Sequence, residues 1–564
     1  MASLNSSPAW KALKTHAGKT ATAHLRQLFA ADPKRFKRLS LAVGSLFLDY
    51  SKNRITPETL RLLTRLAREA DVASWRRRLF KGEAVNVSEG RAALHVALRA
   101  RPGDRVGDRD AFARGLRERR RVKRFADDIA AGRRTGAGGR PFRAAVVLGI
   151  GGSHLGPAMA VAALAPYRRP DFDARFVSSM DSAALSRGLD GLEPATTLVV
   201  VASKTFTTEE TMANARAVRA WLAKALGERQ ALKQMAAVSA DTAAVDRFGI
   251  ACDDTFQIWD WVGGRFSLTS AMGLPLALAI GGKRFDEFLD GARAIDRHFL
   301  AAPLERNMPA ILALVGVWNA DFLSLPGLAV VPYDDRLRHF PAYLQQLEME
   351  SNGKSVDRLG QPLESGGAPI IFGGPGTGAQ HAFFQSLHQG RQPIAADFIA
   401  VAEDGPTAGF HPGGDHRQRL NANMLAQAEA LMAGRPMAEA KKALRAAGIK
   451  GAGWKWLAPH WTFAGNRPSN VILLGRLDPF ALGQLVALYE HKVFVEAVIW
   501  GINPFDQWGV ELGKELAAGI LPALKSKAPK GRQATHDAST AGLIRRLKAK
   551  KWGRRPSKRL GKQR

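Results

Sequence analysis

Buried-strand patterns alternate with helix patterns twice along this chain, and this alternation most constrains its fold. Residues 143–150 (RAAVVLGI) and 197–202 (TLVVVA) are short, continuously apolar runs, and a long helix pattern over 209–226 follows the second. Helix 155–165 and strands 175–177 and 234–239 complete this first set. Continuously apolar strands that alternate with helices predict a parallel sheet covered by helices on both faces.

A second alternation follows farther along the chain. Its strand patterns lie at 328–332, 369–373, 398–402 and 469–474, and its helix patterns lie at 308–322, 379–387, 420–432 and 479–500. A chain of 564 residues is too long for a single core. We therefore predict an α/β protein with two doubly wound domains and mainly parallel sheets. The expected parts are a helical segment over 1–120 that packs on the larger domain, a smaller α/β domain over 121–285, a larger one over 286–523, and a basic tail over 524–564.

The formal charge of +31 is unevenly distributed. Residues 524–564 hold 15 Lys or Arg and one acid, Asp537. This composition predicts a disordered tail, at most partly helical over 538–552. A solvated extension is the preferred interpretation, and a contact with nucleic acid is the weaker one.

The sequence shows neither a targeting segment nor a membrane segment. The N-terminus lacks the basic head and apolar run of a signal peptide. The longest uncharged apolar stretch, 266–282, contains Pro275 and several glycines, so it is predicted to be core. The single cysteine, Cys252, excludes an internal disulfide, and we therefore expect a cytoplasmic protein.

Two segments that connect predicted strands to helices are suited to anions. Residues 149–157 (GIGGSHLGP) bring glycines to a helix N-terminus, where backbone N–H groups bind negative charge. His154 stands where G-x-G-x-x-G needs its third glycine, which disfavours a dinucleotide site. Residues 202–211 (ASKTFTTEET) combine hydroxyls with Lys204, which favours a phosphate monoester over an ordinary helix cap. The absence of a Walker A pattern argues against a nucleoside triphosphatase.

A carboxylate and a guanidinium occur in segments that suit proton transfer. Glu350 ends the predicted helix 340–349 just before the turn signal Asn352-Gly353, so its carboxylate is expected at the lip of a pocket. Arg265 follows two glycines, so it can enter a cleft and stabilise an oxyanion. Each residue alone is more often a solvated surface group, and only their joint occurrence favours a site.

An imidazole and a lysine complete the candidate chemistry. His381 is predicted at the start of a helix after a glycine-rich turn, a place suited to proton transfer, although a core histidine is the ordinary alternative. Lys514 lies among glycine and aromatic residues and is expected to reach inward. His411 and His416 bracket Pro-Gly-Gly-Asp, but no clustered set of metal ligands is evident, so no metal is expected.

The order of these motifs resembles the phosphoglucose isomerase family. The matching segments are GIGGSHLGP, SKTFTTEET, DWVGGRFSLTSAMG, QQLEMESNGKS, GAQHAFFQSLHQG and INPFDQWGVELGK. Residues 48–56 and 86–99 also look like the family, so the resemblance covers about residues 10–520. It implies two sugar-isomerase (SIS-type) α/β domains, a homodimer and no cofactor. It also implies the interconversion of D-glucose 6-phosphate and D-fructose 6-phosphate in glycolysis and gluconeogenesis.

The resemblance also implies roles for individual residues. Glu350 corresponds to the base that moves a proton between C1 and C2, and Arg265 to the arginine beside the enediolate. His381, contributed by the dimer partner, corresponds to the ring-opening acid/base, and Lys514 to the lysine near the ring oxygen. The implied substrate-binding residues are Gly152, Ser153, Ser203, Lys204, Thr205, Thr208 and Gln346, with Gln507 a weaker candidate.

Three positions depart from the family pattern as we know it. His154 replaces an expected Asp, Gly378-Ala379 replaces Asn-Gly, and Pro504 stands where Ser is common. These departures put affinity or epimer selectivity in question more than the reaction. Two alternatives stay open: an isomerase that also accepts mannose 6-phosphate, and a non-catalytic sugar-phosphate sensor whose tail binds nucleic acid. The presence of Glu350, His381 and Arg265 favours the strict enzyme.

Overall fold

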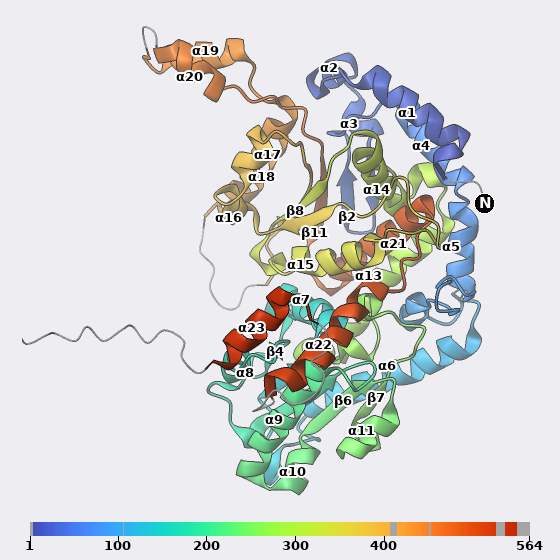
Figure 1. Ribbon diagram of the computed structural model, residues 1–564, viewed down its shortest axis with the longest axis vertical. Helices are drawn as coiled ribbons and strands as arrows, with labels where there is room; N and C mark the ends of the chain where they lie inside the picture. Colours follow the sequence, from blue (N-terminus) through green and yellow to red (C-terminus); the bar gives the residue numbers. More distant parts are fainter. Residues whose placement is uncertain (1–3, 105, 407–413, 450–452, 526–535, 550–564) are drawn as a thin grey trace, which may run out of the picture. The chain divides into compact units, whose positions relative to one another are not determined.

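The computed structural model describes residues 4–104, 106–406, 414–449, 453–525 and 536–549 (Figure 1). The chain divides into two compact units, Met1–Phe505 and Asp506–Arg564, which are described separately. The domain boundaries expected near residues 120, 285 and 523 stay predictions.

The first alternation forms a parallel sheet that has five strands within the described ranges, in the order β4-β3-β5-β6-β7. The strands are β3 Ala144–Leu148, β4 Asp173–Val177, β5 Thr197–Ala202, β6 Met235–Ser239 and β7 Thr255–Gln257. Successive side chains point to opposite faces, so Val147 and Val200 enter one hydrophobic core while Val146 and Val199 enter another. Both faces are therefore buried, which confirms the prediction of a covered parallel sheet.

The second sheet has the order β1-β2-β11-β10-β8-β9 in the part of the chain that the structure describes. Its parallel strands are β8 Gly327–Tyr333, β9 Ile370–Gly373, β10 Ala395–Glu403 and β11 Ser469–Arg476. The hairpin of β1 Ser40–Val43 and β2 Leu46–Asp49 adds two antiparallel strands beside β11. The expectation of a mostly helical segment over 1–120 missed this hairpin, whose turn is made by Gly44 at a φ of +59°.

The unit Met1–Phe505 contains helices that cover both sheets and one pair, α19 and α20, that packs together away from them (Figure 1). They are α1 Pro8–Thr20, α2 Leu25–Ala31, α3 Arg35–Arg38, α4 Pro57–Glu69, α5 Val72–Lys81, α6 Arg109–Ala130, α7 Leu155–Ala163, α8 Ser182–Leu189, α9 Glu209–Leu226, α10 Glu228–Lys233, α11 Thr242–Phe248, α12 Leu274–Ile280, α13 Gly282–Ala301, α14 Met308–Val317, α15 Phe340–Leu344, α16 Gly376–Gln380, α17 Phe384–Gln389, α18 His416–Ala433, α19 Met437–Ala446, α20 Gly453–His460 and α21 Pro479–Trp500. Helices α13 and α21 pack side by side in a core that receives side chains from both sheets.

Helix α21 is buried along almost its whole length, as its continuous apolar pattern predicted. Asp478 caps its N-terminus through the N–H of Ala481, Pro479 occupies the first turn, and Gly501 ends it in the left-handed conformation at a φ of +72°. These local signals explain why the helix has the predicted bounds.

Two predicted helices differ from the structure near the candidate site. The helix expected at 340–349 is α15 followed by a π-helical turn, Gln345–Glu350, so Glu350 ends a π-helix rather than an α-helix. The helix expected at 379–387 is two short helices, and His381 lies in the turn after α16 rather than at a helix start.

The unit Asp506–Arg564 contains α22 Glu511–Lys525 and α23 Ala538–Lys548. Helix α23 falls inside the predicted helical range 538–552, whereas the predicted disorder at 526–535 and 550–564 lies outside the described residues. Among the helices that the structure describes, none is long and apolar enough to cross a membrane.

Candidate active site

Two loops meet where neighbouring parallel strands of the first sheet end. Strand β3 leads through 149–154 into α7, and β5 leads through 203–208 into α9. A Cβ on Gly149 would lie 3.0 Å from the carbonyl oxygen of Ala202, so the two loops approach closely. Strand β4 lies on one side of β3 and β5 on the other, and such a switch in strand order is where α/β sheets bind ligands.

The loop after β5 forms a cradle of hydroxyl groups at the N-terminus of α9. The Ser203 and Thr208 hydroxyl oxygens lie 3.1 Å apart, and the Thr207 hydroxyl donates to that of Thr205 at 2.8 Å. Phe206 has a φ of +53°, uncommon for a non-glycine residue, and its buried ring anchors the loop in the core. Hydroxyls and N–H groups at the N-terminus of a long helix suit an anion.

Lys204 ties this loop to the segment that precedes Arg265. Its ammonium donates to the carbonyl oxygens of Asp260 at 3.1 Å and Val262 at 3.2 Å, and it lies 3.6 Å from the Asp260 carboxylate. Burial lowers the pKa of Lys204, and Asp260 opposes that shift. The lysine therefore fixes the loop besides offering positive charge.

Arg265 and Glu350 form an ion pair at the centre of the candidate site. Arg265 Nη1 lies 3.2 Å from Glu350 Oε1, and the arginine side chain is 1% exposed whereas that of Glu350 is 21% exposed. Arg265 also donates to Ser351 Oγ at 2.7 Å and to the carbonyl oxygen of Pro504. The guanidinium is thus fixed from three directions, while the carboxylate keeps access to solvent or substrate.

Gly152 and Gln346 lie against the same centre. A Cβ on Gly152 would come within 2.1 Å of the Gly264 carbonyl group, and one on Gly151 within 3.1 Å of Gln346 Nε2. Buried Gln346 Oε1 has no hydrogen-bond partner among the described residues, which makes it an acceptor available to a substrate hydroxyl. The structure therefore brings together Gly152, Gln346, Arg265 and Glu350.

For three other predicted site residues the structure shows the local surroundings alone. Ser153 lies in the turn Gly151–Ser153 before α7. His381 is exposed in the turn between α16 and α17. Lys514 belongs to the other unit, where its exposed ammonium pairs with Glu511 Oε1 at 2.8 Å. The roles of these three residues stay predictions.

The three departures from the family pattern occupy defined places. Pro504 meets Arg265 through its backbone carbonyl, so a change of side chain leaves that acceptor intact. Ala379 is buried in the core beside β8 and β10. The His154 ring contacts Phe176 edge-on at 5.9 Å, and burial lowers the pKa of this histidine.

Sequence reasoning missed two partners of Arg265. Ser351 follows Glu350 directly, but nothing in the sequence shows that its hydroxyl points to a residue 86 positions away. In the sequence Pro504 is distinguished only as a departure from the family pattern, since a backbone acceptor leaves no trace in residue type.

A metal centre is not indicated by the described side chains. No group of three or more His, Cys, Asp or Glu residues within the described ranges is arranged to hold a metal ion. His411 lies outside the described residues, so the interpretation of His411 and His416 stays a prediction.

Comparison with known proteins assigns the chain to a family. The family model for phosphoglucose isomerase matches residues 49–544. Glucose-6-phosphate isomerase 2 of Chromobacterium violaceum is 48% identical over 96% of this chain and 97% of its own length, and the glucose-6-phosphate isomerase of Anaeromyxobacter dehalogenans is 50% identical over 97% of each. The crystal structure of a glucose-6-phosphate isomerase from Chlamydia trachomatis matches 97% of this chain and 99% of its own at a TM-score of 0.83 and 33% identity. This chain belongs to the phosphoglucose isomerase family.

Proposed function

We propose that this chain, as a glucose-6-phosphate isomerase, interconverts D-glucose 6-phosphate and D-fructose 6-phosphate with Glu350 as the base. The family and its relatives supply the activity. The contact of 3.2 Å between Arg265 Nη1 and Glu350 Oε1 is the observation that supports the mechanism. It puts a partly accessible carboxylate beside a buried, fixed cation, which is the pair that an enediolate intermediate needs.

The reaction begins with opening of the sugar ring. A donor must protonate the ring oxygen while a base takes the proton of the C1 hydroxyl of glucose 6-phosphate. We assign the acid/base role to His381 and an assisting role at the ring oxygen to Lys514. The exposure of His381 within this chain fits delivery to the site of a second copy in a homodimer.

Proton transfer follows on the open chain. Glu350 removes the proton from C2 of the aldose, which leaves a cis-enediol whose developing oxyanion lies beside Arg265. The C2 hydroxyl gives up its proton as O1 gains one, and the carboxyl returns its proton to C1, which gives the ketose without a change in oxidation state overall. Glu350 stays close to both carbons because the ion pair and the neighbouring Ser351 contact fix its turn.

The phosphate binds remote from the reacting carbons. We assign it to Ser203, Lys204, Thr205 and Thr208 at the start of α9, where hydroxyls and the helix N-terminus favour an anion. Gly152, Ser153 and Gln346 contact the sugar. Binding energy from the phosphate then orients the reacting end, so a sugar without phosphate should be a poor substrate.

A coupled assay of fructose 6-phosphate conversion in the presence of EDTA tests this function. We expect turnover that EDTA does not change and that strongly favours the glucose over the mannose epimer. Comparable turnover of mannose 6-phosphate would establish the dual-specificity alternative. Sugar-phosphate binding without turnover would instead support a sensor.

Glu350→Gln tests the assigned base in the same assay. The carboxamide keeps the shape but cannot take the proton, so kcat should fall by about 10²–10⁴-fold with little change in affinity. Glu429→Gln on the exposed face of α18 is the matched control and should leave kcat unchanged. Near-normal turnover of Glu350→Gln would remove Glu350 from the role of base.

A further inference from the structure

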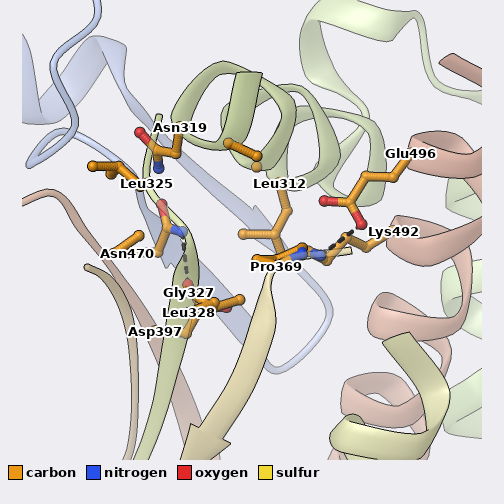
Figure 2. Close-up of a pocket in the computed structure, with 13 residues that line it drawn as sticks. Leu312, Asn319, Leu325, Gly327, Leu328, Pro369, Asp397, Asn470, Lys492 and Glu496 are labelled. Atoms are coloured by element: carbon orange, nitrogen blue, oxygen red, sulfur yellow. Dashed lines mark hydrogen bonds and ion pairs between the residues drawn. The ribbon is translucent and has the colours of Figure 1, made fainter. Parts of the chain in front are cut away.

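A small cavity lies beside Lys492 and Glu496 of α21 (Figure 2). It measures about 20 Å³, far below the roughly 300–1,000 Å³ of typical small-molecule sites, so it does not receive the substrate. Strands β8, β10 and β11 line it together with α14 and α21. Lys492 and Glu496 of α21 form its charged wall, and Figure 2 shows their ammonium and carboxyl groups in contact.

Lys492 joins two carboxyl groups in this buried region. Its Nζ lies 2.7 Å from Glu496 Oε2, one helical turn away, and 2.8 Å from Glu348 Oε2 in the π-helical turn. The side chains of Lys492, Glu348 and Glu496 are 3%, 4% and 1% exposed. Replacing a buried ionic cluster of this kind by well-packed apolar side chains often leaves the stability of a protein unchanged or raises it. Stability alone therefore does not explain why the cluster is present.

The pKa values of Lys492 and Glu496 are both shifted within this cluster. Burial, reinforced by the nearby Glu348 carboxylate, holds the pKa of Glu496 well above its ordinary value. Burial alone would lower the pKa of Lys492, but the two carboxyl groups outweigh it and raise that pKa. The ammonium of Lys492 is therefore favoured between two carboxyl groups, while burial and the Glu348 carboxylate both favour the protonated form of Glu496.

Glu348 also contacts the segment that carries the proposed base, Glu350. Its second oxygen, Oε1, accepts a hydrogen bond of 2.9 Å from Asn352 Nδ2, which also donates to the Val493 carbonyl oxygen of α21 at 3.2 Å. Residues on both sides of Glu350 are thus attached to α21, and Ser351 is attached to Arg265. Glu350 itself remains the partly exposed member of the turn.

We propose that Lys492, held by Glu496, is a positioning residue that fixes Glu348 and thereby the π-helical turn that presents Glu350. The inference rests on the proposed role of Glu350 as base. Lys492 touches neither the substrate nor the reacting atoms. A purely structural cluster would affect folding alone, whereas a positioning cluster must affect kcat in enzyme that is folded.

Lys492→Met tests this role, since it keeps an unbranched side chain up to the Cε position and removes the ammonium. We expect kcat to fall by about 10–100-fold with KM within about twofold, because a misplaced base is felt mainly in the chemical step. Glu496→Gln keeps an acceptor for Lys492 and should retain kcat within about twofold. Asp397→Asn is the matched control: it lines the same cavity and bonds Asn470 and Tyr489, and it should leave kcat unchanged.

Two further variants test the same role in case Lys492→Met does not fold. The double variant Lys492→Met/Glu348→Gln removes the ammonium together with the Glu348 carboxylate that it pairs with. Gly316→Ala changes no charge but puts a Cβ 2.3 Å from Glu496 Oε1, so it displaces Glu496 from behind Lys492. Both should lower kcat by about 3–100-fold at unchanged KM, as a shift of the base by up to about 1 Å would.

The outcomes separate this inference from the proposed function. Normal kcat in the folded Lys492 variants, with Glu350→Gln inactive, overturns the positioning role and leaves Glu350 as the base. Normal turnover of Glu350→Gln overturns both. Loss of folding in all three variants, measured by circular dichroism, would assign the cluster to stability and also contradict the inference.

Discussion

Gly152 and Gly264 touch through their backbones, so that a Cβ on Gly152 would lie 2.1 Å from both the carbonyl carbon and the oxygen of Gly264. Gly264 immediately precedes Arg265 in a short 3-10 turn. The loop after β3 therefore sets the place of the segment that carries the guanidinium. A residue that resembled a substrate contact in the sequence also acts as a spacer between two parts of the site.

Gly152→Ala should accordingly separate Arg265 from Glu350. The methyl group cannot be accommodated by side-chain motion, because the opposing atoms are backbone. We expect kcat/KM to fall by about 10–100-fold, as displacement of a fixed cation by about 1 Å would produce. Gly18→Ala, on an exposed face of α1 with no atom within 4 Å of the new Cβ, is the control and should match the unmodified enzyme. Unchanged kcat/KM for Gly152→Ala would show that the two loops move independently.

Much of the fold could be predicted because local signals agreed with it. Strand β5, helix α9 and helix α21 have the predicted bounds, since apolar runs, caps and terminal glycines coincide at their ends. The β1–β2 hairpin was missed because its strands have four residues each and it joins the sheet through the pairing of β2 with β11, more than 400 positions away. Such pairing leaves no periodicity in so short a segment.

The residue types of the candidate site could be predicted from the sequence, but the contacts between them could not. Glu350 and Arg265 could be identified as groups suited to the chemistry, yet their contact depends on how two distant segments meet. The π-helical turn over Gln345–Glu350 could not be predicted, because an α-helix and a π-helix share the same apolar pattern over so few residues. The proposed role of Lys492 could not be predicted, because the pattern of this apolar helix does not show which side chains the lysine contacts.

Lys204→Ala should weaken binding of phosphorylated sugars. The substitution removes the ammonium from the phosphate loop and also its bonds to the Asp260 and Val262 carbonyl oxygens. We expect KM for fructose 6-phosphate to rise by about 10–100-fold, as for loss of a charged hydrogen bond. Lys224→Ala, on the exposed face of α9, should leave KM unchanged. Unaltered affinity for fructose 6-phosphate in the Lys204 variant would place the phosphate elsewhere.

Mixed dimers test the assignment of His381 to the site of a second copy. Glu350→Gln and His381→Ala should each be inactive when pure. If each site combines Glu350 of one chain with His381 of the other, a hybrid dimer has one intact site, and random mixing restores about a quarter of full activity. The mixture is unfolded, refolded and assayed beside each variant treated alone. Activity that stays at the sum of the two separate values would place both residues in one chain's site.

Asp321 offers a pH-dependent contribution to stability away from the site. Its carboxylate accepts a hydrogen bond of 2.8 Å from Trp500 Nε1, yet burial raises its pKa to about 6. Between about pH 4 and pH 6 the unfolded chain releases this proton while the folded chain keeps it. The free energy of unfolding therefore falls as pH rises through that window, and the penalty is constant above it.

Asp321→Asn should remove this penalty, because the carboxamide stays neutral and still accepts from Trp500. The difference in Tm between the variant and the unmodified protein should grow in favour of the variant from pH 4.5 to about pH 6.5 and then level off. A shift of about two pKa units corresponds to at most about 3 kcal/mol in the free energy of unfolding, and the partial exposure of Asp321 reduces that amount. We therefore expect the Tm of the variant to rise by a few degrees. Asp110→Asn, at an exposed pair with Arg114, controls for the general effect of losing a carboxylate. Thermal melts across this range decide the matter: a Tm difference that stays flat, or moves against the variant as pH rises, would show that Asp321 is ionised in the folded protein throughout.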